Sequence, residues 1–195
     1  MNILITGGCG YIGTVLTEQL LKEGHKVTVI DTQWFGNYLQ EHPNLDIHKL
    51  DIRETDKIPL KGVEVIMHLA NIANDPGVEL NPTLSWEVNV LAGQQLADRA
   101  VREGVKQFIY ASSGSVYGIK EELDVTEELS LVPISVYNKT KMVAERVLLS
   151  YQNQMKVYCI RPATVCGWSP RMRLDVSVNM LTLQALKNAL ITVYG

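Results

Sequence analysis

The chain has few cysteines and no long apolar run. Its three cysteines, Cys9, Cys159 and Cys166, are odd in number and lack the spacing of a zinc site. Asp46 and His48 stand two apart, but no third ligand accompanies them, so no metal site is expected. No apolar segment reaches the roughly 18 residues of a membrane-spanning helix. We therefore expect a reduced, cytoplasmic protein with no secretion signal and no membrane partner.

An excess of basic charge is also absent. Lysine and arginine number 18 against 21 acidic residues, which gives a formal charge of -3 with mixed signs. Nucleic acid is therefore not an expected partner. The 195 residues, 46% of them apolar, suffice for one good-sized core. We find no internal repeat and no linker, and predict one domain over 1–195.

Short apolar runs alternate with stretches of helical periodicity along the chain. Residues 2–6, 26–30 and 107–112 read as buried strands, and helical spacing of apolar residues separates them. Strands that alternate with helices are typical of a sheet whose strands run parallel and whose faces are covered by helices. The predicted fold is α/β, with a doubly wound parallel sheet.

A glycine-rich string from Thr6 to Gly13 lies where the first strand passes into a helix. Such a turn needs residues that tolerate positive φ and let the backbone approach a pyrophosphate, whose charge then lies at the helix N-terminus. A glycine triplet alone also occurs in purely structural turns, so the surrounding strand and helix matter. The expected cofactor contacts in this turn are Gly7, Gly10, Tyr11, Ile12 and Gly13.

Asp31 stands at the end of the second strand, 18 residues after Gly13. A carboxylate at this place accepts hydrogen bonds from the adenosine ribose and repels a 2′-phosphate. Residues 32–34 include no arginine or lysine that could attract such a phosphate. The sequence therefore favours NAD over NADP. The alternative is that Asp31 only caps a loop.

Tyr137 and Lys141 lie four residues apart within 135–151, where an apolar stripe predicts a helix. Their side chains therefore project from one face, where the ammonium favours the tyrosinate. A tyrosine whose pKa falls from about 10 toward neutrality can act as a general base. A tyrosine and a lysine at this spacing are common by chance. Their meaning therefore depends on the glycine-rich string at 6–13 and on the serine-rich string at 112–118.

Ser113 follows the predicted strand at 107–112, at the carboxyl end of the sheet where open α/β folds bind ligands. There its hydroxyl could hydrogen-bond a substrate hydroxyl or carbonyl while Tyr137 exchanges the proton. A Ser-Ser-Gly turn alone is more often structural. The three strings in this order predict a nicotinamide-dependent enzyme.

Together these strings resemble the extended short-chain dehydrogenase/reductase superfamily, in its NAD-dependent epimerase/dehydratase branch acting on nucleotide sugars. Asp51-Ile52-Arg53 is similar to the family's acidic-aliphatic pair that holds the adenine. His68-Leu69-Ala70-Asn71 resembles its His-Leu-Ala-Ala string, Asn89 matches an asparagine of the next helix, and Arg161-Pro162 follows strand six. The cofactor contacts that this resemblance implies are Asp51, Ile52, Leu69, Ala70, Asn71, Asn89, Tyr137, Lys141 and Pro162.

The resemblance further implies a Rossmann-like sheet of about seven strands and a catalytic triad of Ser113, Tyr137 and Lys141. In that family chemistry, the tyrosine abstracts a sugar hydroxyl proton while hydride passes to C4 of the nicotinamide, which gives a keto-sugar. The lysine would also bind the nicotinamide ribose. A nucleotide sugar is the implied substrate, and a homodimer formed through the helices at 85–103 and 137–151 is an open expectation.

Departures from the family pattern narrow the reaction. Sugar 4,6-dehydratases usually have Asp-Glu directly after the catalytic Ser/Thr, and decarboxylating relatives usually keep a glutamate where this chain has Ser115. The string Gly114-Ser115 therefore favours an epimerase, and UDP-galactose 4-epimerases have a similar serine-rich string. A nucleotide-sugar reductase or dehydrogenase stays open. Thr164 is expected to contact substrate, but it replaces a common asparagine, and Cys166 replaces a common tyrosine, so the sugar is not fixed.

The last part of the chain predicts a helix at 175–190 and a strand at 191–194. Relatives continue with further elements that close over the sugar nucleotide, so we expect much of the substrate-binding part to be missing. The chain is then either a fragment of a longer enzyme or a natural short form that binds the dinucleotide without turnover. We favour the fragment, because an idle triad has no evident reason to keep all three members.

Overall fold

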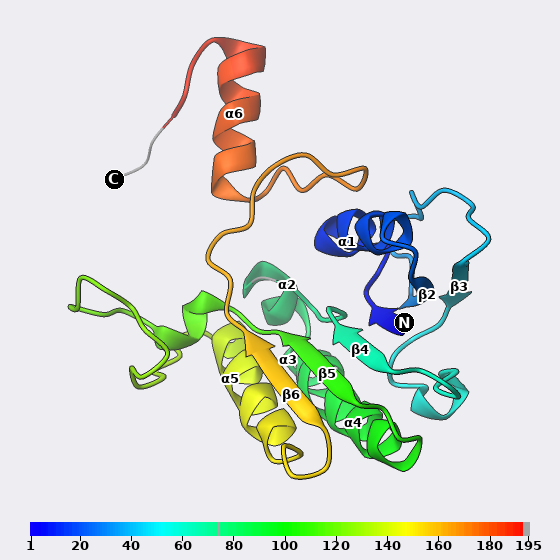
Figure 1. The fold of residues 1–195 in the computed structure, drawn as a ribbon. Helices are drawn as coiled ribbons and strands as arrows, with labels where there is room; N and C mark the ends of the chain where they lie inside the picture. Colours follow the sequence, from blue (N-terminus) through cyan, green and yellow to red (C-terminus); the bar gives the residue numbers. More distant parts are fainter. Residues whose placement is uncertain (74, 193–195) are drawn as a thin grey trace.

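One parallel sheet organises the computed structural model, which describes residues 1–73 and 75–192 (Figure 1). Its strands stand in the order β3-β2-β1-β4-β5-β6, and every neighbouring pair is parallel. The strands are β1 (Asn2–Thr6), β2 (Lys26–Asp31), β3 (Leu45–Lys49), β4 (Val65–His68), β5 (Gln107–Ala111) and β6 (Lys156–Ile160). The order reverses between β1 and β4, which is where open α/β sheets bind their ligands.

Helices cover both faces of this sheet (Figure 1). They are α1 (Tyr11–Lys22), α2 (Asp75–Leu80), α3 (Pro82–Trp86), α4 (Ala92–Arg102), α5 (Val136–Leu149) and α6 (Ser177–Asn188). A π-helical segment, Glu87–Leu91, joins α3 to α4, and short 3-10 turns lie at Thr55–Lys57 and Gly114–Tyr117. The helix begins at Pro82, earlier than the expected residue 85, because the Asn81 side chain accepts a hydrogen bond from Leu84 N and caps it.

Successive side chains of the central strands β1, β2, β4 and β5 enter two separate cores. Leu4 and Phe108 pack with α4 and α5 on one face, whereas Ile5 and Val29 pack with Leu20 of α1 on the other. This follows from the two-residue period of a strand, and it explains why the strands are apolar on both faces. The doubly wound parallel fold expected from the sequence is confirmed.

The expected number of strands is not reached among the described residues, which form six rather than about seven. The strand expected at 191–194 is absent at 191–192, and residues 193 and 194 lie outside the described part. The physical reason is the lack of a partner, because a strand needs a neighbour to bond its backbone. After β6 the chain leaves the sheet, and α6 stands away from it (Figure 1).

No helix in the described part of the chain is long and apolar enough to cross a membrane. Within the same residues, no cluster of three or more His, Cys, Asp or Glu side chains is arranged to hold a metal ion. Asp46 and His48 hydrogen-bond each other at 2.8 Å.

Candidate cofactor and catalytic site

The turn after β1 is shaped by close backbone approach. Gly7 has φ +76°, and a Cβ there would lie 2.7 Å from Ala70 N. A Cβ on Gly13 would lie 2.2 Å from the Gly7 carbonyl oxygen. No side chain caps the first turn of α1, whose N–H groups have no intrahelical acceptors. The turn therefore requires glycine at both positions and leaves an open helix N-terminus suited to a pyrophosphate.

Asp31 binds the protein backbone with both carboxylate oxygens. One accepts from Cys9 N at 3.0 Å and the other from Gln33 N at 2.7 Å. Capping of the loop is thus part of its role, and each oxygen keeps acceptor capacity for a ribose. Burial, and then the charge of Asp31, raises the pKa of the Cys9 thiol to about 12, so this thiol stays protonated.

Five buried polar side-chain atoms lack a hydrogen-bond partner among the described residues, and two of them belong to loops that follow strands at the carboxyl edge of the sheet. These two are Asn71 Oδ1, just after β4, and Ser112 Oγ, just after β5. Buried polar atoms without partners are rare in proteins, and at this edge they fit a polar ligand. Together with the glycine turn, they make the residues present compatible with a dinucleotide.

The residues expected near the adenine form a charged group. The Asp51 carboxylate accepts from Arg53 Nη2 at 2.8 Å, and Arg53 also donates to Glu87 at 3.0 Å. Hydrogen bonding to Arg53 lowers the pKa of Asp51, against the opposing effect of burial. Ile52 lies beside them in the core. Contact of Asp51 and Ile52 with the cofactor stays a prediction.

Asn89 is buried and its side-chain amide is engaged by the protein. Its Oδ1 accepts from Ile72 N at 2.7 Å, and its Nδ2 donates to Thr140 Oγ1 at 3.1 Å. Thr140 in turn donates to the Tyr137 carbonyl at 2.7 Å. Asn89 therefore joins the loop after β4 to the helix that bears Tyr137. Its role as a cofactor contact stays a prediction, as do those of Leu69 and Ala70.

Lys141 is buried beside Tyr137, as the spacing predicted. Its ammonium donates to the Ala111 carbonyl at 2.7 Å and lies 5.8 Å from the centre of the Tyr137 ring. It also lies 4.9 Å from the Tyr110 ring centre. Burial lowers the pKa of Lys141 to about 7, and the charge of Glu145 opposes that shift. The side chain therefore changes charge near neutral pH.

Ser113 begins a chain of hydroxyl groups that the sequence did not reveal. Ser115 Oγ donates to Asn138 Oδ1 at 2.6 Å, and Ser113 Oγ lies 2.7 Å from Ser115 Oγ. Because the single proton of Ser115 is directed to Asn138, Ser113 must be the donor to Ser115. Ser113 also accepts from Ser115 N at 3.2 Å, which leaves its hydroxyl one free lone pair. Asn138 directly follows Tyr137, so this chain links the serine loop to α5.

A buried ion pair next to the triad was also missed. Glu145 lies four residues after Lys141, and its carboxylate accepts from Arg161 Nη2 at 2.7 Å and from Arg161 Nε at 3.0 Å. Arg161 donates as well to Tyr117 Oη at 2.8 Å, in the turn after Ser113. The pair therefore holds α5, the end of β6 and the serine loop together. The helical spacing of Tyr137, Lys141 and Glu145 was the available signal.

The segment after β6 contributes the remaining predicted residues. The Pro162 carbonyl accepts from Gly114 N at 2.8 Å, so it lies against the serine loop. Thr164 is exposed. The Tyr11 hydroxyl, from the glycine turn, donates to the Gly167 carbonyl at 2.7 Å. The structure thus brings Pro162 and Tyr11 to the site, whereas substrate contact by Thr164 stays a prediction.

Comparisons with known proteins agree with this geometry. The family described as NAD dependent epimerase/dehydratase matches residues 3–195. UDP-glucuronic acid decarboxylase 1 of Xenopus tropicalis is 32% identical over 100% of this chain and 48% of its own length. UDP-glucose 4-epimerase of Lactobacillus helveticus is 30% identical over 76% of this chain and 46% of its own. The chain thus spans about half the length of these curated relatives.

Among solved structures, UDP-glucuronic acid 4-epimerase from Bacillus cereus, in complex with UDP-glucuronic acid and NAD, superposes with a TM-score of 0.82. It is 27% identical, and the match covers 100% of this chain and 66% of that one. These matches confirm the resemblance identified from the sequence. They also confirm NAD as the cofactor of the family.

The geometry of Asp31 predicts tighter binding of NAD than of NADP. A lost ribose hydrogen bond and a like charge should together cost NADP about 1 to 3 kcal/mol. Calorimetric titration of both dinucleotides measures this difference. Asp31→Ala should narrow it, and equal or tighter NADP binding by the unaltered chain would contradict the assignment.

Burial of Lys141 predicts a specific pH dependence of stability. Its pKa is 10.5 as the reference value and about 7 in the fold, so between these pH values the unfolded chain binds a proton that the folded chain lacks. Its contribution to the free energy of unfolding therefore rises with pH in that window, by up to about 1.4 kcal/mol per unit, and is lowest and constant below pH 7. Urea denaturation from pH 6 to 9 measures the free energy of unfolding. Its rise with pH should be smaller in Lys141→Met than in the unaltered chain.

Lys139 provides the matched control, because it lies on the same helix and is exposed. Lys139→Met should keep the pH profile of the unaltered chain. Parallel profiles for the unaltered chain and Lys141→Met would show that the Lys141 amine is not desolvated as described.

Proposed function

This chain belongs to the NAD-dependent epimerase/dehydratase family, and we propose that it forms part of a nucleotide-sugar epimerase that works through a keto-sugar. The observation that supports this most is the composition of the serine loop. Ser113 meets Ser115, which in turn donates to Asn138, so the partners in this loop are hydroxyl and amide groups only. Dehydration needs a further acid and base beside the triad, and decarboxylating relatives usually keep a glutamate at the Ser115 position, whereas epimerisation needs neither.

Each member of the triad has one task in this proposal. The free lone pair of Ser113 accepts a hydrogen bond from a sugar hydroxyl next to the reacting one and so orients the sugar, while the single proton of the reacting hydroxyl points to Tyr137. Tyr137, as the tyrosinate anion, removes the proton of the reacting sugar hydroxyl. The nearby Lys141 ammonium favours that anion. Bound NAD supplies a hydride acceptor that also returns the hydride. Return to the opposite face of a rotated keto-sugar inverts the carbon.

The hydrogen-bonded supports prepare these groups before substrate arrives. Asn138 fixes the direction of the Ser115 and Ser113 hydroxyls, and the Arg161–Glu145 pair holds the serine loop against α5. A site whose groups are already oriented loses less freedom in the transition state. A nucleotide-sugar reductase or dehydrogenase would use the same groups but release the oxidised or reduced sugar.

A second candidate is a dinucleotide-binding module without turnover. It is favoured by the exposure of Thr164, the residue expected to contact sugar, and of Leu186 and Ile191 around α6. A sugar bound there would have little protein around it. The two candidates differ in whether a nucleotide sugar reacts, while both require the dinucleotide crevice.

Tyr137→Phe should separate chemistry from binding in a full-length, active form of the enzyme. Removal of the general acid/base should lower turnover by roughly 10²-fold or more while NAD affinity stays nearly unchanged. Lys141→Ala should lower both. Tyr158→Phe, on exposed Tyr158 of β6, is the control and should leave both unchanged. Normal turnover by Tyr137→Phe would place the base elsewhere.

The 195-residue chain should bind NAD without turning over a nucleotide sugar. The cofactor residues identified above all lie within it, but water reaches the region around Thr164, and a poorly held sugar loses up to roughly 7 to 11 kcal/mol of barrier reduction. Its exposed apolar surface should also promote self-association. Calorimetry with NAD, an assay with UDP-sugars and sedimentation test these parts in turn. Turnover comparable to that of a full-length relative would contradict the interpretation that much of the substrate-binding part is missing from these 195 residues.

A further inference from the structure

A segment distant in sequence returns to the glycine turn. Between β6 and α6 the chain runs back toward α1 (Figure 1), and there Ser169 Oγ donates to the Tyr11 carbonyl at 2.8 Å. Asn179 Nδ2 donates to Tyr11 Oη at 3.0 Å, while Asn179 Oδ1 accepts from Gly167 N at 3.0 Å. Residues 167–179 are therefore fixed at the start of α1.

Arg171 extends from this segment to the loop after β2. Its guanidinium carbon lies 4.1 Å from the centre of the Phe35 ring, and Phe35 follows Asp31 by four residues. Asp31 itself bonds Cys9 of the glycine turn and Gln33 of the loop after β2. Because one end of the segment is fixed at the glycine turn and Arg171 touches the loop after β2, its charge lies at the loop that follows Asp31.

Most N–H groups of the Arg171 guanidinium have no acceptor among the hydrogen bonds of the described residues. It has five N–H groups, and the hydrogen bond described for it is a long one, 3.5 Å, to the Met172 carbonyl. Arg173, by contrast, is paired with Asp175 at 2.5 Å. Burial, and then the charge of Arg173, lowers the pKa of Arg171, while Asp175, Tyr38 and, least of these, Asp31 oppose that shift.

We propose that Arg171 contacts the adenosine end of the bound dinucleotide and acts against Asp31 as a second determinant of the choice between NAD and NADP. A guanidinium pairs strongly with a phosphate, so a 2′-phosphate that Asp31 repels is attracted by Arg171. The chain prefers NAD, but less strongly than Asp31 alone would dictate. This inference rests on the proposed function, since it assumes that the crevice binds a dinucleotide.

Calorimetric titration of the 195-residue chain with NAD and with NADP tests the proposal without any turnover. Arg171→Ala should lower NADP affinity about tenfold more than NAD affinity, so the NAD preference widens, whereas Asp31→Ala narrows it. Arg171→Lys should retain part of the effect, because it keeps the charge and loses the planar fork. The dependence of NADP affinity on salt should weaken in Arg171→Ala.

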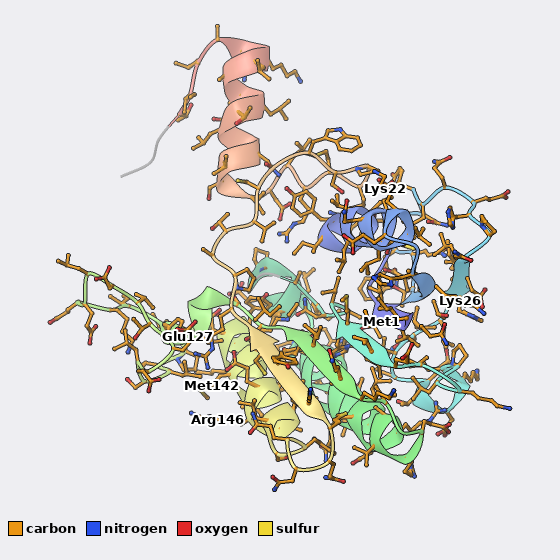
Figure 2. The ribbon with its side chains drawn as sticks, in the orientation of Figure 1. Met1, Lys22, Lys26, Glu127, Met142 and Arg146 are labelled. Carbon is orange, nitrogen blue, oxygen red and sulfur yellow. The ribbon has the colours of Figure 1, made fainter. Side chains whose placement is uncertain are left out.

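Arg146→Ala is the matched control, since Arg146 is exposed on α5, away from α1 (Figure 2). It should leave both affinities unchanged. Phe35→Leu removes the aromatic ring and keeps the guanidinium, so NADP should still bind better than to Arg171→Ala. If Arg171→Ala folds poorly, Arg171→Gln provides the same comparison.

The failures of the two proposals can be told apart. An unchanged NAD to NADP ratio in Arg171→Ala, or an equal loss for both dinucleotides, overturns the role of Arg171 and leaves the dinucleotide crevice intact. Absence of binding of either dinucleotide by the unaltered chain contradicts the proposed function itself.

Discussion

The contact between the glycine turn and the end of β4 is the constraint on which the site depends. Gly7 lies so close to Ala70 that no side chain fits, and its N–H bonds the Ile30 carbonyl at the end of β2. Three strand ends and the start of α1 are therefore fixed relative to one another. This is the point at which the strand order reverses, so the open N-terminus of α1 faces the place where a ligand can lie between two strands.

The second half of the site is built on α5. Tyr137, Lys141 and Glu145 follow one another there at intervals of four residues, so a phenol, an amine and a carboxylate lie on one face of the helix. Lys141 is buried and bonded to a main-chain carbonyl, and the Glu145 carboxylate is buried and paired with Arg161. A buried charge is costly unless it is paired and hydrogen-bonded, so each partner is needed to keep its group in place. Neighbouring His68 is buried as the neutral imidazole, because burial lowers its pKa to about 3. It therefore adds no buried charge.

Family membership and local geometry answer different questions. The family match and the solved neighbours establish the fold and the dinucleotide, whereas relatives of similar identity are named for decarboxylation and for epimerisation. Within this chain, the contacts that bear on these questions are the hydroxyl chain through Ser115 to Asn138 and the segment at 167–179 that reaches the glycine turn. The reaction and the choice of dinucleotide therefore have to be argued from these contacts.

The sequence by itself determined the glycine turn, the parallel α/β fold and the pairing of Tyr137 with Lys141. Each depends on residues a few positions apart, where periodicity and backbone preference act directly. Its expectation of a strand from residue 191 fails at 191–192, since an apolar run becomes a strand only beside a partner. Only the tertiary structure decided that Arg161 meets Glu145 and that Arg171 meets Phe35. Contacts such as that between Tyr11 and Gly167, 156 residues apart, are set by how packed elements bring loops together, and no local pattern encodes them.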